Sequence, residues 1–244
     1  MINKIKKMST LVLGFVMAVF LTACGSAGGN STAESSTTES SATESSTAES
    51  SADENSLAGD SETVPAGEEN GSNILVAYFS LAGEQYNVGV IEEGNTSIIA
   101  HMIAEQTGAD LFEIEAVTPY PETHSELLDV SREEMANNAR PEIVGTVENM
   151  ADYDTVFIGY PNWWGDMPMI VYHFIESYDF AGKTIVPFCT HGGSGLSGTE
   201  RAIADITGAA MKDGFAISGE TAQNNRERSR DEVSAWLQEG GFIE

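Results

Sequence analysis

Short apolar runs alternate with longer amphipathic stretches in the part of the chain from Asn73 to Glu244. The apolar runs predict strands at 74–79, 110–116, 155–160, 184–189 and 214–218. The amphipathic stretches predict helices at 95–106, 122–138, 167–177, 199–207 and 226–238. Because strands and helices alternate, the strands can be parallel, with the connecting helices on both faces of one sheet. The pattern therefore predicts an α/β domain built as a three-layer α/β/α sandwich around a five-stranded parallel sheet.

The first 24 residues carry the pattern of a secretion signal. Three lysines, Lys4, Lys6 and Lys7, precede an uncharged apolar run at 11–20. This run is shorter than the ~20 apolar residues that a membrane-spanning helix needs. The Leu-Thr-Ala-Cys run that follows resembles the lipobox of bacterial lipoproteins, which implies that Cys24 is lipidated and becomes the mature amino terminus.

Residues 25–72 are dominated by Ser, Thr, Glu, Ala and Gly and contain repeated Glu-Ser-Ser units. With almost no large apolar side chains, this segment cannot offset the entropy of ordering. We expect an extended, solvated tether, and a binding tail or a glycosylated stalk is the alternative. Together with the lipobox, the tether predicts that a folded domain at 73–244 is held at the extracytoplasmic face of the cell membrane by the lipid anchor alone.

The protein is strongly acidic, with a formal net charge of -27 at pH 7. This charge argues against a nucleic-acid partner and favours partners with a basic patch. With Cys24 lipidated, no disulfide framework exists, and Cys189 at the end of an apolar run is predicted to be a small buried residue rather than a reactive thiol. The four histidines show no metal-ligand spacing, so no metal site is predicted.

The loop after the first predicted strand has the composition of an anion site. Ligands of parallel sheets bind beyond the carboxyl ends of the strands, where this loop lies. Its hydroxyls, glycines and helix amino terminus can hold a phosphate, because backbone N–H groups and the helix dipole supply positive potential. The candidate residues are Ser80, Gly83, Gly94, Asn95 and Thr96. They can also act only as turn and cap residues, and the absence of Lys and Arg argues against a Walker-type nucleotide site.

Two further loops, which follow the third and fourth predicted strands, can hold a planar ring. The first contains Pro161, Asn162, Trp163, Trp164 and Gly165, and the second contains Thr190, His191, Gly192, Gly193, Ser194 and Gly195. Adjacent residues of an extended loop point in different directions, so we expect one tryptophan in the core and the other stacked on a ligand. The glycines of the second loop either let backbone amides approach a ring edge or only permit turns.

These three loops resemble those of the flavodoxin-like FMN proteins, and the resemblance covers residues 73–242. It is carried by Ala77-Tyr78-Phe79-Ser80 with Gly94-Asn95-Thr96, by residues 159–165 and by the loop at 190–195. The resemblance implies a strand order of 2-1-3-4-5 and FMN as the cofactor. It also implies that the FMN phosphate lies against Ser80, Gly94, Asn95 and Thr96, and that the isoalloxazine lies between the other two loops. Residues 84–93 depart from the family pattern because they enlarge the phosphate loop.

The resemblance implies an electron-transfer flavoprotein that needs no catalytic acid or base and whose partner is a redox protein or a small electron acceptor. An FMN-dependent NAD(P)H:quinone-type oxidoreductase is the alternative, and a cofactor-free binding module is more distant. The shortage of Lys and Arg in the loops disfavours NADPH and favours the carrier. It also predicts a strongly reducing flavin, because reduction adds negative charge to the ring. His191 is expected either to stabilise that charge or to pack, and Tyr120 and His124 either to wall the site or to pack.

Overall fold

The computed structural model describes residues 73–244. The predicted secretion signal at 1–24, the lipidation site Cys24 and the tether at 25–72 lie outside the described residues. Within residues 73–244, every helix is too short or too polar to span a lipid bilayer. Because Cys24 lies outside the described residues, attachment to the membrane through a lipid stays a prediction from the sequence.

The central sheet is parallel, and its strand order confirms the order 2-1-3-4-5. The sheet has six strands, one more than predicted, and the five longer ones are β1 (Ile74–Tyr78), β4 (Asp110–Glu113), β5 (Thr155–Pro161), β6 (Thr184–His191) and β8 (Phe215–Ser218). In space they follow the order β4-β1-β5-β6-β8, and every pair of neighbours is parallel. A two-residue strand, β7 (Ala210–Met211), also pairs with the beginning of β6. The carboxyl ends of β1, β5 and β6 consequently lie next to one another at one end of the sheet.

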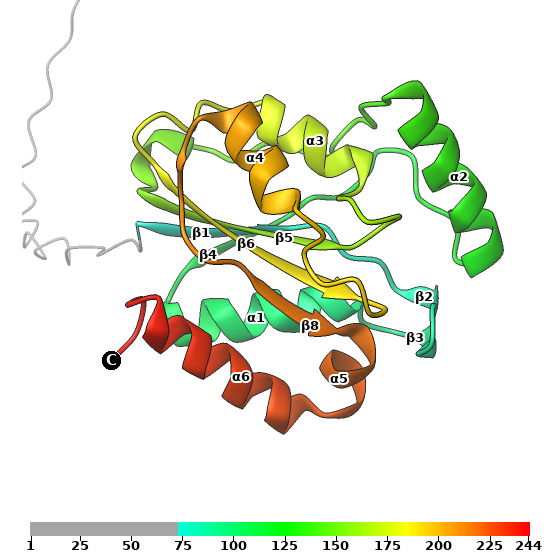
Figure 1. Ribbon diagram of the computed structural model, residues 1–244. Helices are drawn as coiled ribbons and strands as arrows, with labels where there is room; N and C mark the ends of the chain where they lie inside the picture. The colour runs from blue at the N-terminus through cyan, green and yellow to red at the C-terminus, as the bar shows by residue number, and fades with distance from the viewer. Residues whose placement is uncertain (1–72) are drawn as a thin grey trace, which may run out of the picture. The chain divides into compact units, whose positions relative to one another are not determined.

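Helices cover both faces of the sheet (Figure 1). One face carries α1 (Asn95–Thr107), α5 (Gly219–Asn224) and α6 (Arg226–Glu239), and the other carries α3 (Met169–Glu176) and α4 (Thr199–Thr207), with α2 (His124–Asn137) beside α3. Neighbouring strand residues point to opposite faces, so Leu75 belongs to one apolar core with Phe174, whereas Val76 belongs to the other with Ile103. This arrangement confirms the three-layer α/β/α sandwich.

Local sequence explains where several elements begin and end. Helix α1 ends at Thr107, and its cap residue Gly108 has a left-handed φ of 71°, as expected for a glycine cap. Helix α3 begins at Met169 rather than at residue 167, because Pro168 is extended and disfavours helical geometry in the residue before it. Strand β4 ends at Glu113, three residues earlier than predicted.

The structure also contains short elements that the apolar pattern does not predict. They are the hairpin of β2 (Gly83–Gln85) and β3 (Gly89–Ile91), the 3₁₀ turn η1 (Met150–Asp152), strand β7 and helix α5. The hairpin is antiparallel and forms a separate two-stranded sheet inside the enlarged loop at 84–93. Three residues are too few to establish a strand period, so the pattern alone could not reveal it.

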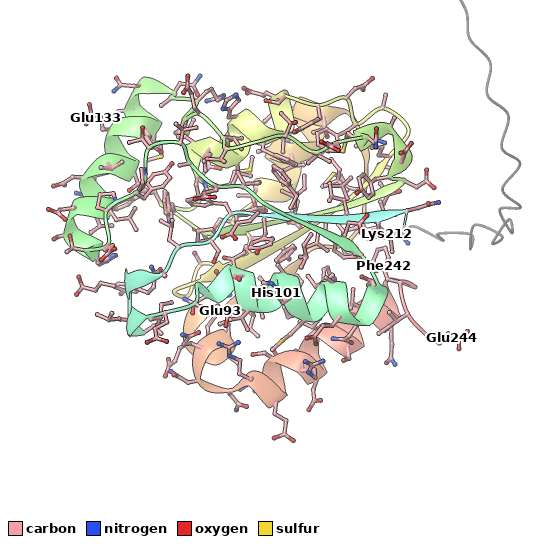
Figure 2. All side chains as sticks on the ribbon, turned by 180° about the vertical axis from the view of Figure 1, so that it is seen from behind. Glu93, His101, Glu133, Lys212, Phe242 and Glu244 are labelled. Carbon is pink, nitrogen blue, oxygen red and sulfur yellow. The ribbon has the colours of Figure 1, made fainter. Side chains whose placement is uncertain are left out.

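His101 lies on the surface of α1, close to Glu93 (Figure 2). Its Nδ1 is 4.0 Å from one carboxylate oxygen of Glu93, and Arg226 donates to the other oxygen at 3.1 Å. The side chain of His101 is half exposed, and His101 does not contribute to the cavity described below. It is therefore a surface residue of the helix.

Candidate functional site

A cavity of about 470 Å³ lies at the carboxyl ends of β1, β5 and β6. It brings together residues from all three loops that the sequence singles out. The predicted residues that line it are Ser80, Asn95, Thr96, Pro161, Asn162, Trp163, Trp164, Gly165, Thr190, His191, Gly192 and Ser194. Four other candidates, Gly83, Gly94, Gly193 and Gly195, do not line it. That the lining residues contact FMN stays a prediction.

The amino terminus of α1 forms a polar cradle at one end of the cavity. The N-cap residue Gly94 offers no side chain, and the hydroxyl of Ser80 takes its place by accepting a hydrogen bond from the N–H of Ser97 at 3.0 Å. The first N–H groups of the helix, at Asn95 and Thr96, have no carbonyl partner within the helix and point out of its end. The hydroxyls of Thr96 and Thr190 lie 2.8 Å apart and join this cradle to the carboxyl end of β6.

Gly94 shapes the cradle by allowing a close backbone approach. A Cβ atom at this position would lie 2.1 Å from the Ser80 hydroxyl oxygen and 2.7 Å from the carbonyl oxygen of Leu81. No side chain fits into that space. Gly94 therefore lets the loop after β1 pack directly against the amino terminus of α1.

The two adjacent tryptophans have different environments. Trp163 packs edge-on against Phe79 and Tyr120, with ring centroids 5.5 and 5.6 Å away. Trp164 is 45% exposed and has a left-handed φ of 59°. Its indole N–H donates to the hydroxyl of Ser131 at 3.0 Å. Both indoles line the cavity, so neither is confined to the core.

The two ring loops are tied to each other through Asn162. Its side-chain N–H donates to the carbonyl of Gly195 at 2.8 Å, and its side-chain oxygen accepts from the N–H of Gly165 at 3.0 Å. Gly193 and Gly195 have φ of 133° and 63°, so they serve as turn residues that hold this loop in shape. Gly83, with φ of 89°, has the same role at the base of the hairpin.

The sequence left two roles open for Tyr120 and His124, which were to line the site or only to pack, and the structure gives each residue a different one. His124 lines the cavity, whereas Tyr120 packs behind Trp163. The hydroxyl of Tyr120 donates to a carboxylate oxygen of Glu134 at 3.1 Å. Burial raises the pKa of Glu134 above its ordinary value, because the charged form loses solvation there.

Two segments that the sequence reasoning missed complete the cavity wall. The hairpin contributes Gln85 and Tyr86, and α2 contributes Leu127, Leu128 and Ser131. Leu81 and Gly219 also line it. The signal for the hairpin was the Asn87-Val88-Gly89 sequence, because Asn and Gly accept the left-handed φ angles of 59° and 94° that they adopt here.

The chain matches the family model described as flavodoxin over residues 73–239. It belongs to the flavodoxin family. Two solved structures of proteins proposed to be flavoproteins are similar to it. One, from Bacteroides uniformis, is 32% identical, has a TM-score of 0.56 and aligns with 69% of this chain and 99% of its own. The other, from Bacteroides eggerthii, is 31% identical, has a TM-score of 0.55 and aligns with 69% and 97%. A comparison with curated proteins gave no significant match.

The cavity of this flavodoxin-family domain has no formal charge in its walls. None of the Lys, Arg, Asp and Glu residues between 73 and 244 lines it, and its titratable groups are Tyr86, His124 and His191. Over the same part of the chain, no three His, Cys, Asp or Glu side chains are placed to bind a metal ion. Cys189 is fully buried, and burial raises the pKa of its thiol to about 12, so it stays protonated and unreactive near neutral pH.

His191 has a defined tautomer when it is neutral. Its Nδ1 accepts a hydrogen bond from the N–H of Gly193 at 2.9 Å, so the proton of the neutral ring is on Nε2. Desolvation by burial lowers the pKa of His191 below its ordinary value of 6.5. The folded protein therefore favours the neutral ring.

This lowered pKa predicts a loss of stability in acid. The unfolded chain binds a proton at His191 more readily than the folded chain, so the free energy of unfolding should fall as pH decreases through 6.5. The variant His191→Asn keeps an acceptor for the Gly193 N–H and should show a shallower fall between neutral pH and pH 5. Urea unfolding over this pH range measures the difference, with His101→Asn as the control outside the cavity. Equal pH slopes for wild type and His191→Asn would contradict the expectation.

Proposed function

We propose that this protein is an FMN-binding electron-transfer flavoprotein. The observation that carries the proposal is the cavity itself, which joins a neutral polar cradle at a helix amino terminus to walls that contain two tryptophans. FMN has a matching division into a phosphate and a planar apolar ring. When bound, FMN supplies reversible electron transfer, and the protein supplies binding, orientation and electrostatics.

The cradle fits a phosphate on two grounds. The side-chain oxygen of Asn95 is buried without a hydrogen-bond partner, although buried polar atoms are almost always paired. A phosphate needs a donor, so Asn95 would hold it with the amide turned about its last bond, which places the NH₂ group where the unpaired oxygen lies. Hydroxyls of Ser80 and Thr96 and the first N–H groups of α1 surround the same space. In the proposal, these residues hold the phosphate.

The isoalloxazine ring would be held by the loops at 161–165 and 190–194. Asn162 ties the two loops together, and Trp163 and Trp164 provide apolar ring surfaces. No side chain in these loops is needed as an acid or base, because electron transfer breaks no bond in the protein. A lipid anchor at Cys24 would hold the domain at the outer face of the cell membrane, and a redox partner protein or a small acceptor would exchange electrons with it.

A direct NAD(P)H:quinone-type oxidoreductase is the second candidate. It is favoured by one observation, which is that Leu127 and Leu128 of α2 extend the cavity with apolar wall beyond the three loops. Against it stands the lack of any Lys or Arg among the described residues that line the cavity, since such residues would receive the phosphates of NADPH. The carrier therefore remains the function that the site supports better.

The decisive experiment is a titration of the purified protein with FMN. We expect visible absorption bands of bound flavin and quenching of both flavin and tryptophan fluorescence. Absence of any spectral change would overturn the proposal. Assays with reduced nicotinamides and quinones then separate the two candidates, because sustained turnover without a partner protein would favour the oxidoreductase.

A further inference from the structure

The β2–β3 hairpin places an aromatic side chain at the cavity. Its turn is closed by a hydrogen bond from the N–H of Val88 to the carbonyl of Gln85 at 3.2 Å, with Tyr86 at the first central position. The hairpin is fixed to the residues that precede and begin α2. The N–H of Glu84 donates to the carbonyl of Glu122 at 2.8 Å, and its carboxylate accepts from the N–H of His124 at 3.0 Å. The position of Tyr86 is therefore set by two anchors at the base of the hairpin.

Tyr86 reaches across to the loop that follows β6. A Cβ atom on Gly192 would lie 2.8 and 3.0 Å from two atoms of the Tyr86 ring, so the phenol lies where Gly192 has no side chain. The ring centroid of Tyr86 is 5.9 Å from that of His124. Tyr86 lines the cavity and yet is 61% exposed. One part of its ring thus faces the cavity and another part remains in solvent.

The loop at 190–195 contains no Trp, Tyr or Phe. The tryptophans of the loop at 161–165 therefore have no aromatic counterpart within the 190–195 loop itself. Tyr86 supplies aromatic surface at this place, from a segment that is distant from both loops in the sequence. An exposed aromatic side chain beside an apolar cavity gains contact area when a planar ligand enters.

We propose that Tyr86 is a ring-binding residue, delivered by the β2–β3 hairpin to pack against the isoalloxazine beside Gly192. This inference rests on the proposed binding of FMN and adds a residue of the phosphate loop to the two loops at 161–165 and 190–195 that were expected to hold the ring. In the opposing interpretation, Tyr86 only occupies a hairpin turn and its contact with the cavity has no effect on the ligand.

Because the hairpin lies inside the phosphate loop, the test must separate the ring from the phosphate. Dissociation constants are measured by fluorescence titration for FMN and for riboflavin, which has the same ring without the phosphate. The variants are Tyr86→Ala, Tyr86→Phe and the control Val90→Ala. Val90 belongs to the same hairpin, is 83% exposed and does not line the cavity.

Tyr86→Ala should weaken the binding of FMN and riboflavin by the same factor, about tenfold. Tyr86→Phe and Val90→Ala should stay within about twofold of wild type, because both keep the aromatic ring of residue 86. Iodide should also quench the fluorescence of bound flavin more efficiently in Tyr86→Ala than in wild type, because the variant leaves one side of the isoalloxazine uncovered.

Two outcomes would overturn the role of Tyr86 while leaving FMN binding intact. If Tyr86→Ala binds both ligands like wild type, the tyrosine is only a turn residue. If it loses affinity for FMN but not for riboflavin, the substitution has disturbed the phosphate cradle instead. Failure of the wild-type protein to bind either ligand would be a different result, because it would overturn the proposed function itself.

Discussion

Replacing Gly94 by alanine is expected to weaken FMN binding about a hundredfold, because overpacking a tight site costs about 1–3 kcal/mol. The added methyl group would lie 2.1 Å from the hydroxyl oxygen of Ser80 and within 3 Å of two backbone atoms of Leu81. Backbone atoms cannot rotate away as a side chain can. The loop and the amino terminus of α1 must therefore separate, which removes the cap on Ser97 and moves the cradle that would hold the phosphate.

Gly108→Ala is the matched control for this substitution. Gly108 lies at the other end of α1, has open space around its Cβ position and has a left-handed φ of 71°. An alanine there strains the backbone by about 1 kcal/mol without touching the cavity. Fluorescence titration with FMN and urea unfolding should show lower stability for both variants but lower affinity only for Gly94→Ala. A Gly94→Ala protein with wild-type affinity would show that the cradle does not hold the phosphate.

The second large effect is expected on the reduction potential of bound FMN. We expect it to lie below that of free FMN, because reduction adds negative charge inside a protein of net charge -27 whose cavity walls, in the described residues, contain no cation. Gln85→Lys introduces an ammonium group at the cavity wall and should raise the potential. A gain of about 1.4 kcal/mol for the reduced form corresponds to a rise of about 30 mV for a two-electron couple.

Val90→Lys provides the control for the new charge. It changes the net charge by the same amount on the same hairpin, but residue 90 is 83% exposed and outside the cavity. Solvent screening should reduce its effect on the potential to a small fraction. Equal shifts in both variants would mean that the potential responds to the total charge of the protein rather than to the walls of the cavity.

Hydrophobic periodicity was sufficient to predict the layers, whereas the strand order came from the resemblance to flavodoxins. Fully buried strands such as β5 and β6 appear as continuous apolar runs, because both faces of a parallel sheet are covered by helices. The hairpin was missed because each of its strands has only three residues, and five of these six residues are exposed or half-buried. The hairpin is held by hydrogen bonds of Glu84 to Glu122 and His124, and such contacts between distant segments cannot be read from local strand propensity.

The candidate site was predictable where residues follow a strand directly. Ser80 comes two residues after β1, and Thr190 and His191 end β6, so their place at the sheet end follows from the topology. The contributions of Leu127 and Tyr86 depend on how α2 and the hairpin fold back over that end. No periodicity encodes such a contact. Gly94 and Gly193 were predicted to contact the ligand, but they do not line the cavity. Gly94 allows a close backbone contact and Gly193 allows a turn, and composition alone cannot distinguish these roles from ligand contact.

The two ends of the cavity are built on helices with unequal attachment to the domain. Helix α1 buries eight of its residues, whereas α2 buries only Leu127 and Ser131. Segments with few buried contacts unfold locally at a lower free energy than the whole domain. We therefore expect the wall formed by α2 to open at a lower free energy than the helix behind the polar cradle. Access to the apolar end of the cavity and the global stability of the domain can then vary independently.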